Sequence, residues 1–246
     1  MRAGTVSYGT FLGLASPVAA EVIAAAGANW LLLDLEHGAA TEDHIGPTVV
    51  ASGGYGVPTI VRTESGERIR IGRALDLGAA GVMVPRIETP EEVRDVVRSF
   101  HFPPTGNRGV ASYNRAARWG MDPSAMSSQS AAAVIIQIET IKALENLEKI
   151  ASVEGVHMLF VGPLDLSYSL GIPRAFGSEE FETALRKVVA EARKNNISAG
   201  ILAPTAEAAR RYRDLGFTFI AIASDSVLLA NIFSSTIHEL KEQTHD

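Results

Sequence analysis

A short apolar run ends at an acidic residue in the stretch VIIQIET, residues 134–140, and a helical pattern follows it. The same arrangement returns in LFVGPLD, residues 159–165. Short apolar runs of this kind are typical of buried strands, and strands that alternate with helices are typical of a parallel sheet. The carboxyl ends of parallel strands lie at one edge, so we expect Glu139 and Asp165 to lie close together there.

The rest of the chain repeats this strand–helix unit. Eight strand–helix pairs in strict alternation predict an α/β fold, a (β/α)8 barrel, formed by one domain over residues 1–246. The length is near the roughly 250 residues typical of such barrels. Strands are predicted near residues 5–13, 30–34, 58–62, 81–84, 132–138, 157–161, 197–202 and 218–223. Helices are predicted near residues 16–27, 41–53, 67–78, 90–100, 140–151, 178–195, 205–215 and 225–242.

The composition narrows the class of protein. Of the 246 residues 46% are hydrophobic, which is enough for a large core. A net charge of −6 argues against nucleic acid as a partner. The absence of cysteine excludes disulfides, thiolate nucleophiles and cysteine–zinc sites. Neither a signal pattern nor an apolar run of about 18 residues occurs, so we expect a cytoplasmic protein without a membrane partner.

A barrel of this type carries its functional side chains at the carboxyl ends of its strands. The rule selects one candidate metal pair, one histidine beside two acids, and one arginine, all on one rim. For the serine and aspartate after the last strand, a helix cap is a simpler expectation than a phosphate site. The residues selected are Asp34, Glu36, His37, Arg62, Pro85, Arg86, Glu139, Asp165, Ser224 and Asp225.

Glu139 and Asp165 form a candidate site for a divalent cation. Two carboxylates plus water molecules suit Mg²⁺, Mn²⁺ or another ion that prefers oxygen ligands. A 2-oxo acid would add its carboxylate and ketone oxygens, and chelation would stabilise the negative charge that forms when the adjacent carbon loses a proton. The alternative is structural, with both acids placed at helix N-termini. Spacing alone leaves both interpretations open.

The stretch DLEH, residues 34–37, offers a group for proton transfer. His37 can transfer protons near neutral pH, and the carboxylate of Asp34 could fix its tautomer. Successive residues of a strand face opposite sides, so this pairing requires the chain to turn after Glu36. A surface loop of mixed charge is the alternative.

Arg62 directly follows the apolar run VPTIV, residues 57–61, and should reach the barrel mouth. There its guanidinium could bind an enolate or carboxylate oxygen. A salt bridge to one of the rim acids is the alternative, and the two can coexist. Backbone N–H groups of the turn at residues 162–165 could bind a substrate carboxylate.

Two absences and one insertion are also informative. No nucleotide-phosphate motif occurs. Residues 101–131 show no clean periodicity, and a connection this long is usually functional or mobile. An imine-forming aldolase needs a lysine in the barrel mouth. All five lysines instead fall in predicted helices or at their ends: Lys142, Lys149, Lys187, Lys194 and Lys241.

Several ordered motifs over nearly the whole chain resemble the HpcH/HpaI aldolase family, which includes 4-hydroxy-2-oxoheptanedioate and 2-dehydro-3-deoxyglucarate aldolases. They are WLLLDLEH at 30–37, IVR at 60–62, LDLG at 75–78, PPTGNRGV at 103–110, QIET at 137–140, VEGV at 153–156, FVGPLDLS at 160–167 and GILAP at 200–204.

The resemblance implies a barrel of the phosphoenolpyruvate/pyruvate type, assembled as a homo-hexamer (a dimer of trimers) whose last helix is exchanged between subunits. It implies a class II pyruvate aldolase, a carbon–carbon lyase that reversibly cleaves a 4-hydroxy-2-oxo acid to pyruvate and an aldehyde through a metal-stabilised enolate. The cofactor would be a divalent cation, Mg²⁺, Mn²⁺ or Co²⁺.

The resemblance also implies residue roles. Glu139 and Asp165 would bind the cation, and Arg62 would stabilise the enolate. His37, supported by Asp34, would transfer the proton of the aldol hydroxyl. Asp76 would approach an active site at a subunit contact. Further substrate contacts would come from Phe11, Gln137, Gly162, Leu164 and Asp165.

Two departures from the family pattern concern the aldehyde pocket. Phe11 stands where an indole is often found, and Leu164 replaces a small residue. These two departures leave the identity of the aldehyde undetermined. Two other functions also stay open at this point. One is a carbon–carbon lyase acting on acyl-CoA thioesters, for which Arg108, Arg115 and Arg118 are the only basic group in view. The other is a non-catalytic protein that binds oxo acids or sugar acids.

Overall fold

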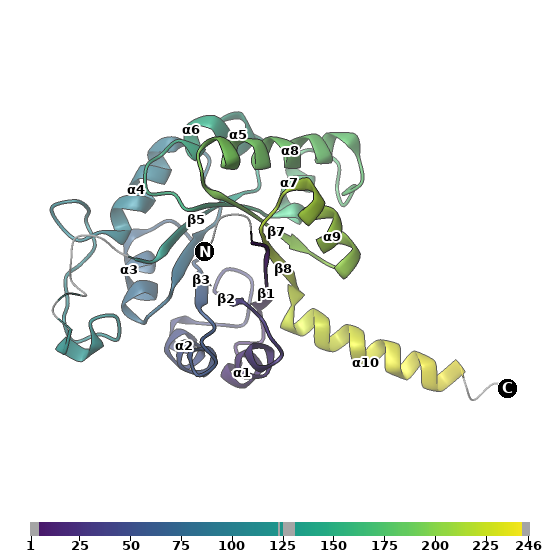
Figure 1. The fold of residues 1–246 in the computed structure, drawn as a ribbon, viewed down its shortest axis with the longest axis horizontal. Coiled ribbons are helices and arrows are strands. Elements are labelled where there is room, and N and C mark those ends of the chain that lie inside the picture. Colours follow the sequence, from purple (N-terminus) through teal and green to yellow (C-terminus); the bar gives the residue numbers. More distant parts are fainter. Residues whose placement is uncertain (1–4, 123, 125–130, 243–246) are drawn as a thin grey trace.

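The eight strands form a closed parallel barrel in consecutive order, with β8 beside β1 (Figure 1). This computed structural model describes residues 5–122, 124 and 131–242. The strands are β1 (Ser7–Leu12), β2 (Trp30–Asp34), β3 (Thr59–Arg62), β4 (Gly81–Val84), β5 (Ala133–Ile138), β6 (Met158–Val161), β7 (Ser198–Ala203) and β8 (Phe219–Ser224). The predicted (β/α)8 barrel is confirmed.

Helices surround the barrel and follow the strands in the predicted alternation. They are α1 (Pro17–Ala25), α2 (Ile45–Gly53), α3 (Arg68–Asp76), α4 (Pro90–Phe100), α5 (Ile141–Glu145), α6 (Leu147–Ala151), α7 (Pro163–Ser169), α8 (Glu179–Lys194), α9 (Ala206–Leu215) and α10 (Asp225–Glu242). Two short 3₁₀ helices, η1 (Glu42–His44) and η2 (Arg118–Gly120), complete the set in the described residues.

Local sequence signals explain most helix boundaries. The hydroxyls of Thr89 and Thr205 accept the backbone N–H three residues on, as N-caps of α4 and α9. Pro90 occupies the first turn of α4, where its missing N–H costs nothing. Gly216 ends α9 with φ +110°, a left-handed conformation that favours glycine.

Two predicted boundaries were wrong. The helix predicted over residues 140–151 is two helices, α5 and α6, which meet at Asn146. At this junction the side chain of Asn146 donates a hydrogen bond to the carbonyl of Glu88 at 2.9 Å. The helix α7 has no range among those predicted, although a helical pattern was expected to follow Asp165. It begins because Gly162 provides an extended N-cap and Pro163 fits the first helical position.

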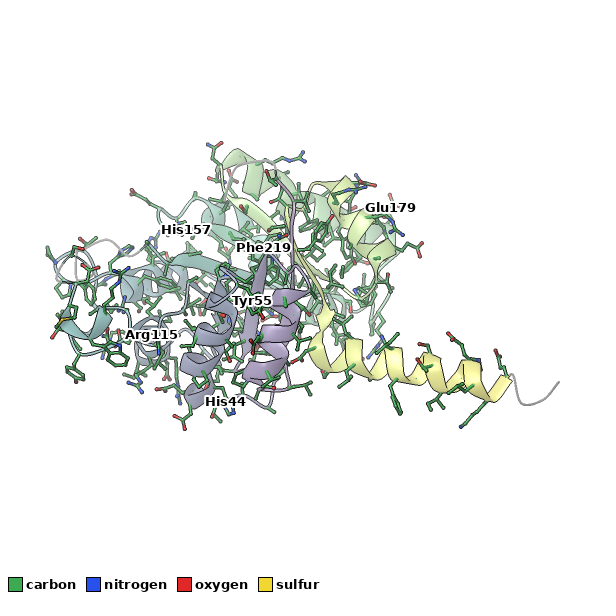
Figure 2. The ribbon with its side chains drawn as sticks, turned by 60° about the horizontal axis from the view of Figure 1, so that its bottom comes forward. His44, Tyr55, Arg115, His157, Glu179 and Phe219 are labelled. Carbon is green, nitrogen blue, oxygen red and sulfur yellow. The ribbon has the colours of Figure 1, made fainter. Side chains whose placement is uncertain are left out.

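The core has two layers. Large side chains fill the barrel interior, where the rings of Trp30 and Phe219 stack at 3.8 Å between centroids. Figure 2 shows Phe219 at the centre of the molecule. A Cβ at Gly9 would overlap the indole of Trp30, so glycine is required there. A second, larger cluster lies between the strands and the helices. The filled interior leaves only the ends of the barrel open for a site.

The last helix, α10, extends away from the barrel (Figure 1). Asp225 is its one buried residue among those described. Large apolar side chains lie in the open along it, including Leu229, Ile232 and Phe233, which are 61%, 63% and 68% exposed. Neither α10 nor any other described helix combines the length and the apolar character that a membrane span requires.

Candidate active site

Three polar side chains form the inward-facing layer of the barrel at the carboxyl ends of its strands. Asp34 on β2, Arg62 on β3 and Gln137 on β5 each lie two residues beyond an apolar side chain of the interior cluster. Residues two apart on a strand share a face, so all three point into the mouth. The register pairs Asp34 with Arg62, and all three side chains are buried. The strand pattern therefore positions them.

Arg62 and Asp34 form a two-pronged ion pair. The guanidinium Nε donates to Asp34 Oδ1 at 2.9 Å and Nη2 donates to Oδ2 at 2.7 Å. Burial acts to raise the pKa of Asp34, but the hydrogen bonds and charge of Arg62 outweigh it, and the pKa lies below its ordinary value. Burial likewise acts to lower the pKa of Arg62, and Asp34 overcomes this and raises it. Both groups are charged at neutral pH.

Glu36 meets the remaining nitrogen of the same guanidinium. Its Oε2 lies 3.1 Å from Arg62 Nη1, close enough for an ion pair but without the geometry of a hydrogen bond. Burial raises the pKa of Glu36, and the charges of Asp34 and Asp165 add to this while Arg62 opposes it. The sequence predicted that Glu36 lies on the rim but assigned it no role. The structure shows a half-buried acid whose Oε2 is shielded from solvent and accepts no hydrogen bond.

The expected pairing of the His37 ring with Asp34 is not formed. Asp34 Oδ1 accepts the backbone N–H groups of Glu36 at 3.1 Å and His37 at 3.3 Å, so the chain turns already at Asp34. Because Arg62 also occupies this carboxylate, the imidazole has no access to it. The ring Nε2 lies 3.8 Å from Glu36 Oε2 instead. Asp34 thus orients the backbone of His37, and Glu36 is the acid nearest its ring.

Glu139 is held on the other side of the mouth. Its Oε1 accepts the backbone N–H of Arg86 at 2.8 Å, and its Oε2 accepts the side-chain amide of Gln137. The Gln137 oxygen faces Arg62 Nη1 at 3.5 Å, so Gln137 links the two halves of the layer. Burial raises the pKa of Glu139, and the charge of Asp165 raises it further. The carboxylate therefore lies in negative surroundings that a cation would relieve.

The donor set at this edge fits a hard divalent cation. Asp165, in the first turn of α7, is exposed and close enough to Glu139 to raise its pKa. A Cβ on Gly162 would lie 2.8 Å from Glu139 Oε2, so only glycine leaves this carboxylate its place. No group of three or more metal-binding side chains occurs in the described part of the chain. A cation held here would take two protein carboxylates as ligands and would leave its other positions to water.

A cavity of about 510 Å³ opens from this layer. Asp34, His37 and Leu164 line it, together with Phe11, whose ring lies 5.1 Å below the Arg62 guanidinium. The remaining lining comes from the segments after β1 and β2, the first turn of α7, the loop between α7 and α8, the ends of β7 and β8, α9, and the first turn of α10. Arg174 and Phe176 belong to that loop. Sequence reasoning missed both, because no local pattern shows that a loop folds back over a cavity.

Three candidates lie apart from this layer. Asp76 ends α3 and binds Arg108 of the long connection, Oδ1 to Nη2 at 2.6 Å. Asp225 joins α10 to β1, because its carboxylate accepts the backbone N–H groups of Gly13 at 2.8 Å and Leu14 at 3.2 Å. Ser224 contacts Ser226 at 3.0 Å. The cap expected at the start of the last helix therefore describes Ser224 and Asp225 better than a phosphate site.

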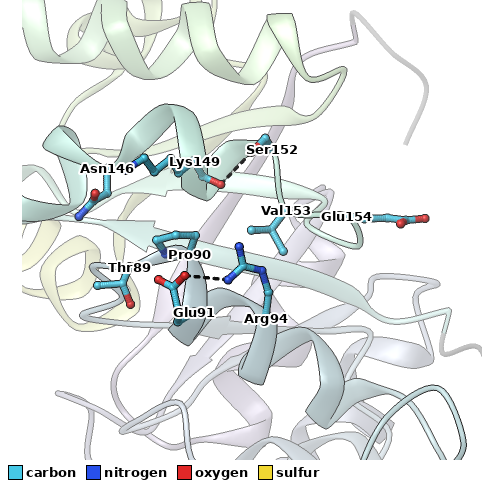
Figure 3. Close-up of a pocket in the computed structure, with 9 residues that line it drawn as sticks. All are labelled: Thr89, Pro90, Glu91, Arg94, Asn146, Lys149, Ser152, Val153 and Glu154. Atoms are coloured by element: carbon cyan, nitrogen blue, oxygen red, sulfur yellow. Dashed lines mark hydrogen bonds and ion pairs between the residues drawn. The ribbon is translucent and has the colours of Figure 1, made fainter.

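Another cavity, of about 550 Å³, lies between α4 and α6 (Figure 3). Its charged lining includes Glu91 and Arg94, which form an ion pair at 2.8 Å, and Lys149. It contains none of the predicted site residues. The volume of a cavity alone therefore does not identify the candidate site. The candidate site is the barrel mouth, because the predicted site residues gather there.

Known proteins are similar to this chain in fold and in sequence. A hydroxypyruvate/pyruvate aldolase of Delftia acidovorans is 37% identical over 93% of this chain and 86% of its own length. A 4-hydroxy-2-oxo-heptane-1,7-dioate aldolase of Escherichia coli is 35% identical over 94% of this chain and 88% of its own. The crystal structure of an HpcH/HpaI aldolase/citrate lyase family protein from Burkholderia cenocepacia superposes with a TM-score of 0.92 and 35% identity, covering 96% of this chain and 95% of that one.

The family model described as HpcH/HpaI aldolase/citrate lyase matches residues 7–232, from β1 into α10. The match includes every residue placed in the barrel mouth. The family predicted from the motifs is confirmed: this chain belongs to the HpcH/HpaI aldolase/citrate lyase family.

Proposed function

We propose that this chain is a divalent-metal-dependent pyruvate aldolase. It would cleave a 4-hydroxy-2-oxo acid to pyruvate and an aldehyde, and would join the two in the reverse direction. The relatives named as aldolases, at 35% to 37% identity over most of the chain, support this carbon–carbon lyase activity. The observation that carries the proposal is the buried Arg62 guanidinium, fixed by Asp34 with its Nη1 facing Gln137 and Glu36.

Glu139 and Asp165 would hold the cation, with Mg²⁺, Mn²⁺ and Co²⁺ as candidates. When bound, such an ion supplies Lewis acidity to the ketone and carboxylate oxygens of the oxo acid. The positions of the lysines favour this class of aldolase over imine chemistry. All five lie in helices (α5, α6, α8 and α10), and none reaches the mouth.

The bond changes assign work to the chain's own residues. The C3–C4 bond breaks, and its electron pair forms the C2–C3 double bond of the pyruvate enolate. Arg62 balances the negative charge that develops on the ketone oxygen. The C4 hydroxyl loses its proton to the His37 region, where Glu36 lies beside the ring, and becomes the aldehyde carbonyl. The enolate then takes a proton at C3.

The mouth also offers contacts that orient the substrate. Gln137 can bind the oxo acid from the same layer as Arg62. The first turn of α7, after Gly162, directs backbone N–H groups toward the site, and these favour the pyruvate carboxylate. Phe11 and Leu164 line the cavity where the aldehyde would lie. Asp76 would act only across a contact with another subunit, since it lies outside this cavity.

The proposed working form is a cytoplasmic homo-hexamer, a dimer of trimers, in which α10 packs on a neighbouring subunit. The exposed apolar face of this helix supports the assembly, because Leu229, Ile232 and Phe233 have no cover within the described chain. Leu14, Leu229 and Phe233 also line a small cavity of about 390 Å³ where α10 leaves the barrel.

The test is pyruvate release from a panel of 4-hydroxy-2-oxo acids, with Mg²⁺, Mn²⁺ and Co²⁺ in parallel and with EDTA. We expect release with at least one ion and none with EDTA. A metal-replete protein that binds oxo acids without cleaving them would support a binding protein instead. Cleavage of malyl-CoA or citramalyl-CoA in preference to the free acids would support the acyl-CoA lyase.

A further inference from the structure

Arg174 lies in the connection between α7 and α8 and lines the barrel-mouth cavity. Its backbone has φ +61°, in the left-handed region that favours glycine and that a side chain with a Cβ rarely adopts. An arginine at such a position is unfavourable for the backbone.

The backbone of Arg174 is fixed to α7. Its N–H donates to Ser167 Oγ at 3.0 Å, and this hydroxyl donates to the carbonyl of Leu164 at 2.7 Å. Ser167 is fully buried. The ring of Phe176 packs edge-on against Phe181 of α8, which holds the other end of the loop. The start of the arginine side chain is therefore set relative to the first turn of α7, which carries the proposed cation ligand.

The cavity contains one unused positive charge. Its charged or titratable lining residues are Asp34, His37, Arg174 and Tyr212, and Asp34 is already neutralised by Arg62. No acidic side chain pairs with Arg174 in the described part of the chain. Around it the cavity is lined by apolar groups, with Phe176, Leu202 and Pro204 among them. An apolar wall with one free guanidinium suits a ligand with a short carbon chain that ends in an anion.

We propose that Arg174 determines which aldehyde this enzyme accepts, by binding an anionic group, a carboxylate or a phosphate, at the end of the aldehyde remote from its carbonyl. The inference rests on the proposed aldolase function and names its acceptor class. The pyruvate half is held by Arg62 and the Glu139–Asp165 edge. The aldehyde half can then extend through the barrel-mouth cavity, from Asp34 and His37 toward Arg174.

The test compares the wild type, Arg174→Gly and Arg174→Lys in aldol addition of pyruvate. One arm pairs 4-oxobutanoate with butanal, and the other pairs glyceraldehyde 3-phosphate with glyceraldehyde. The measured quantity is the ratio of kcat/KM for the anionic aldehyde to that for its neutral partner. Glycine suits the backbone at this position, so Arg174→Gly should unfold no more easily than the wild type in urea. Arg118→Gly is the matched control, because Arg118 also has positive φ (+48°) and does not line the cavity.

We expect the wild-type ratio to exceed one in at least one arm and to fall about tenfold in Arg174→Gly, as for loss of a charge-assisted hydrogen bond. Arg174→Lys should recover part of the ratio, and Arg118→Gly should keep all of it. The arm that responds identifies carboxylate or phosphate. Ratios that are the same in wild type and Arg174→Gly in both arms would overturn the proposal. Deuterium exchange into the methyl group of pyruvate, followed in the same samples without aldehyde, separates this failure from failure of the aldolase function.

Discussion

Arg62 and Asp34 face each other across adjacent strands and share two hydrogen bonds, at 2.9 and 2.7 Å. The pair uses Nε and Nη2 of the guanidinium and leaves Nη1 facing Glu36 and Gln137. A buried planar cation held on one edge has little freedom to turn. Asp34 therefore fixes the orientation of the Arg62 guanidinium in the barrel mouth.

Removing Asp34 should destabilise the fold. Arg62 is 6% exposed, and Asp34→Ala leaves its charge with only the imperfect contact to Glu36. Loss of one partner of a buried pair costs about 3 kcal/mol. Urea unfolding should show this decrease in the free energy of unfolding. The double variant Asp34→Ala with Arg62→Met should recover most of it, and equal midpoints for wild type and Asp34→Ala would argue against a buried pair.

Replacing Arg62 should lower both turnover and stability, because Arg62→Ala also leaves the buried Asp34 carboxylate without its partner. With Arg62→Ala we expect kcat to fall by about 100-fold, since a fixed donor to the developing oxyanion is lost. Arg62→Lys keeps the charge without the two-pronged geometry and should recover only part of the rate. Steady-state pyruvate release measures the turnover of both variants. A turnover number in Arg62→Ala equal to wild type would remove this residue from the mechanism.

A single methyl group at Gly162 should weaken cation binding. The Cβ of Gly162→Ala would lie 2.8 Å from Glu139 Oε2 and 2.9 Å from Gln137 Nε2, which displaces the proposed ligand. We expect at least about tenfold weaker Mn²⁺ binding by calorimetry or EPR, in line with changes that disturb ligand orientation. Gly177→Ala is the control, because a Cβ there meets nothing within 4 Å. Equal affinities in the two variants would contradict the placement of Glu139 as a ligand.

His157 makes stability depend on pH away from the active site. Its ring Nδ1 accepts the backbone N–H of Val134 at 3.1 Å, which requires the neutral ring. Partial burial lowers its pKa below the ordinary value of 6.5, and nearby His101 adds to this. Between the folded and unfolded pKa values the unfolded chain binds more protons, so stability is complete above about pH 6.5 and falls as the pH decreases.

The variant His157→Asn keeps an acceptor in the place of Nδ1 and removes the titration. Urea unfolding at pH 7.5, 6.5 and 5.5 should show a wild-type advantage that shrinks as the pH falls. A difference between the two proteins that stays constant over this range would show that His157 does not contribute the dependence.

The exposed face of α10 should control assembly. Phe233 is 68% exposed on a helix that leaves the barrel, so Phe233→Glu should shift the protein toward smaller species in light scattering or native mass spectrometry. Glu239→Gln, on the same helix, is the control and should retain the wild-type mass. An unchanged mass in Phe233→Glu would exclude this face from the interface.

The sequence predicted the parts of the site that strand periodicity determines. Asp34, Arg62 and Glu139 follow apolar runs, and a barrel brings the ends of such runs to one rim. Partner choice was not predictable in this way. Asp34 could pair with His37 or Arg62, and the register of β2 against β3, a property of the whole sheet, decided for Arg62.

Longer-range placements were also beyond the sequence. Arg174 reaches the cavity only because Ser167 fixes its loop to α7, a contact between residues without any shared pattern. At the junction of α5 and α6, Asn146 donates a hydrogen bond to Glu88, 58 positions earlier in the chain. Local propensity carries no information about such partners.

The most direct test of the account is exchange of the pyruvate methyl protons in D₂O, followed by proton NMR with the full chain and no aldehyde. Exchange reports the enolate that Arg62, Glu139 and Asp165 are proposed to stabilise. The account predicts exchange with Mg²⁺ or Mn²⁺, its loss with EDTA, its recovery with excess ion, and its loss in Glu139→Gln. Exchange that persists in EDTA or in Glu139→Gln, or that never occurs with any divalent ion, would contradict it.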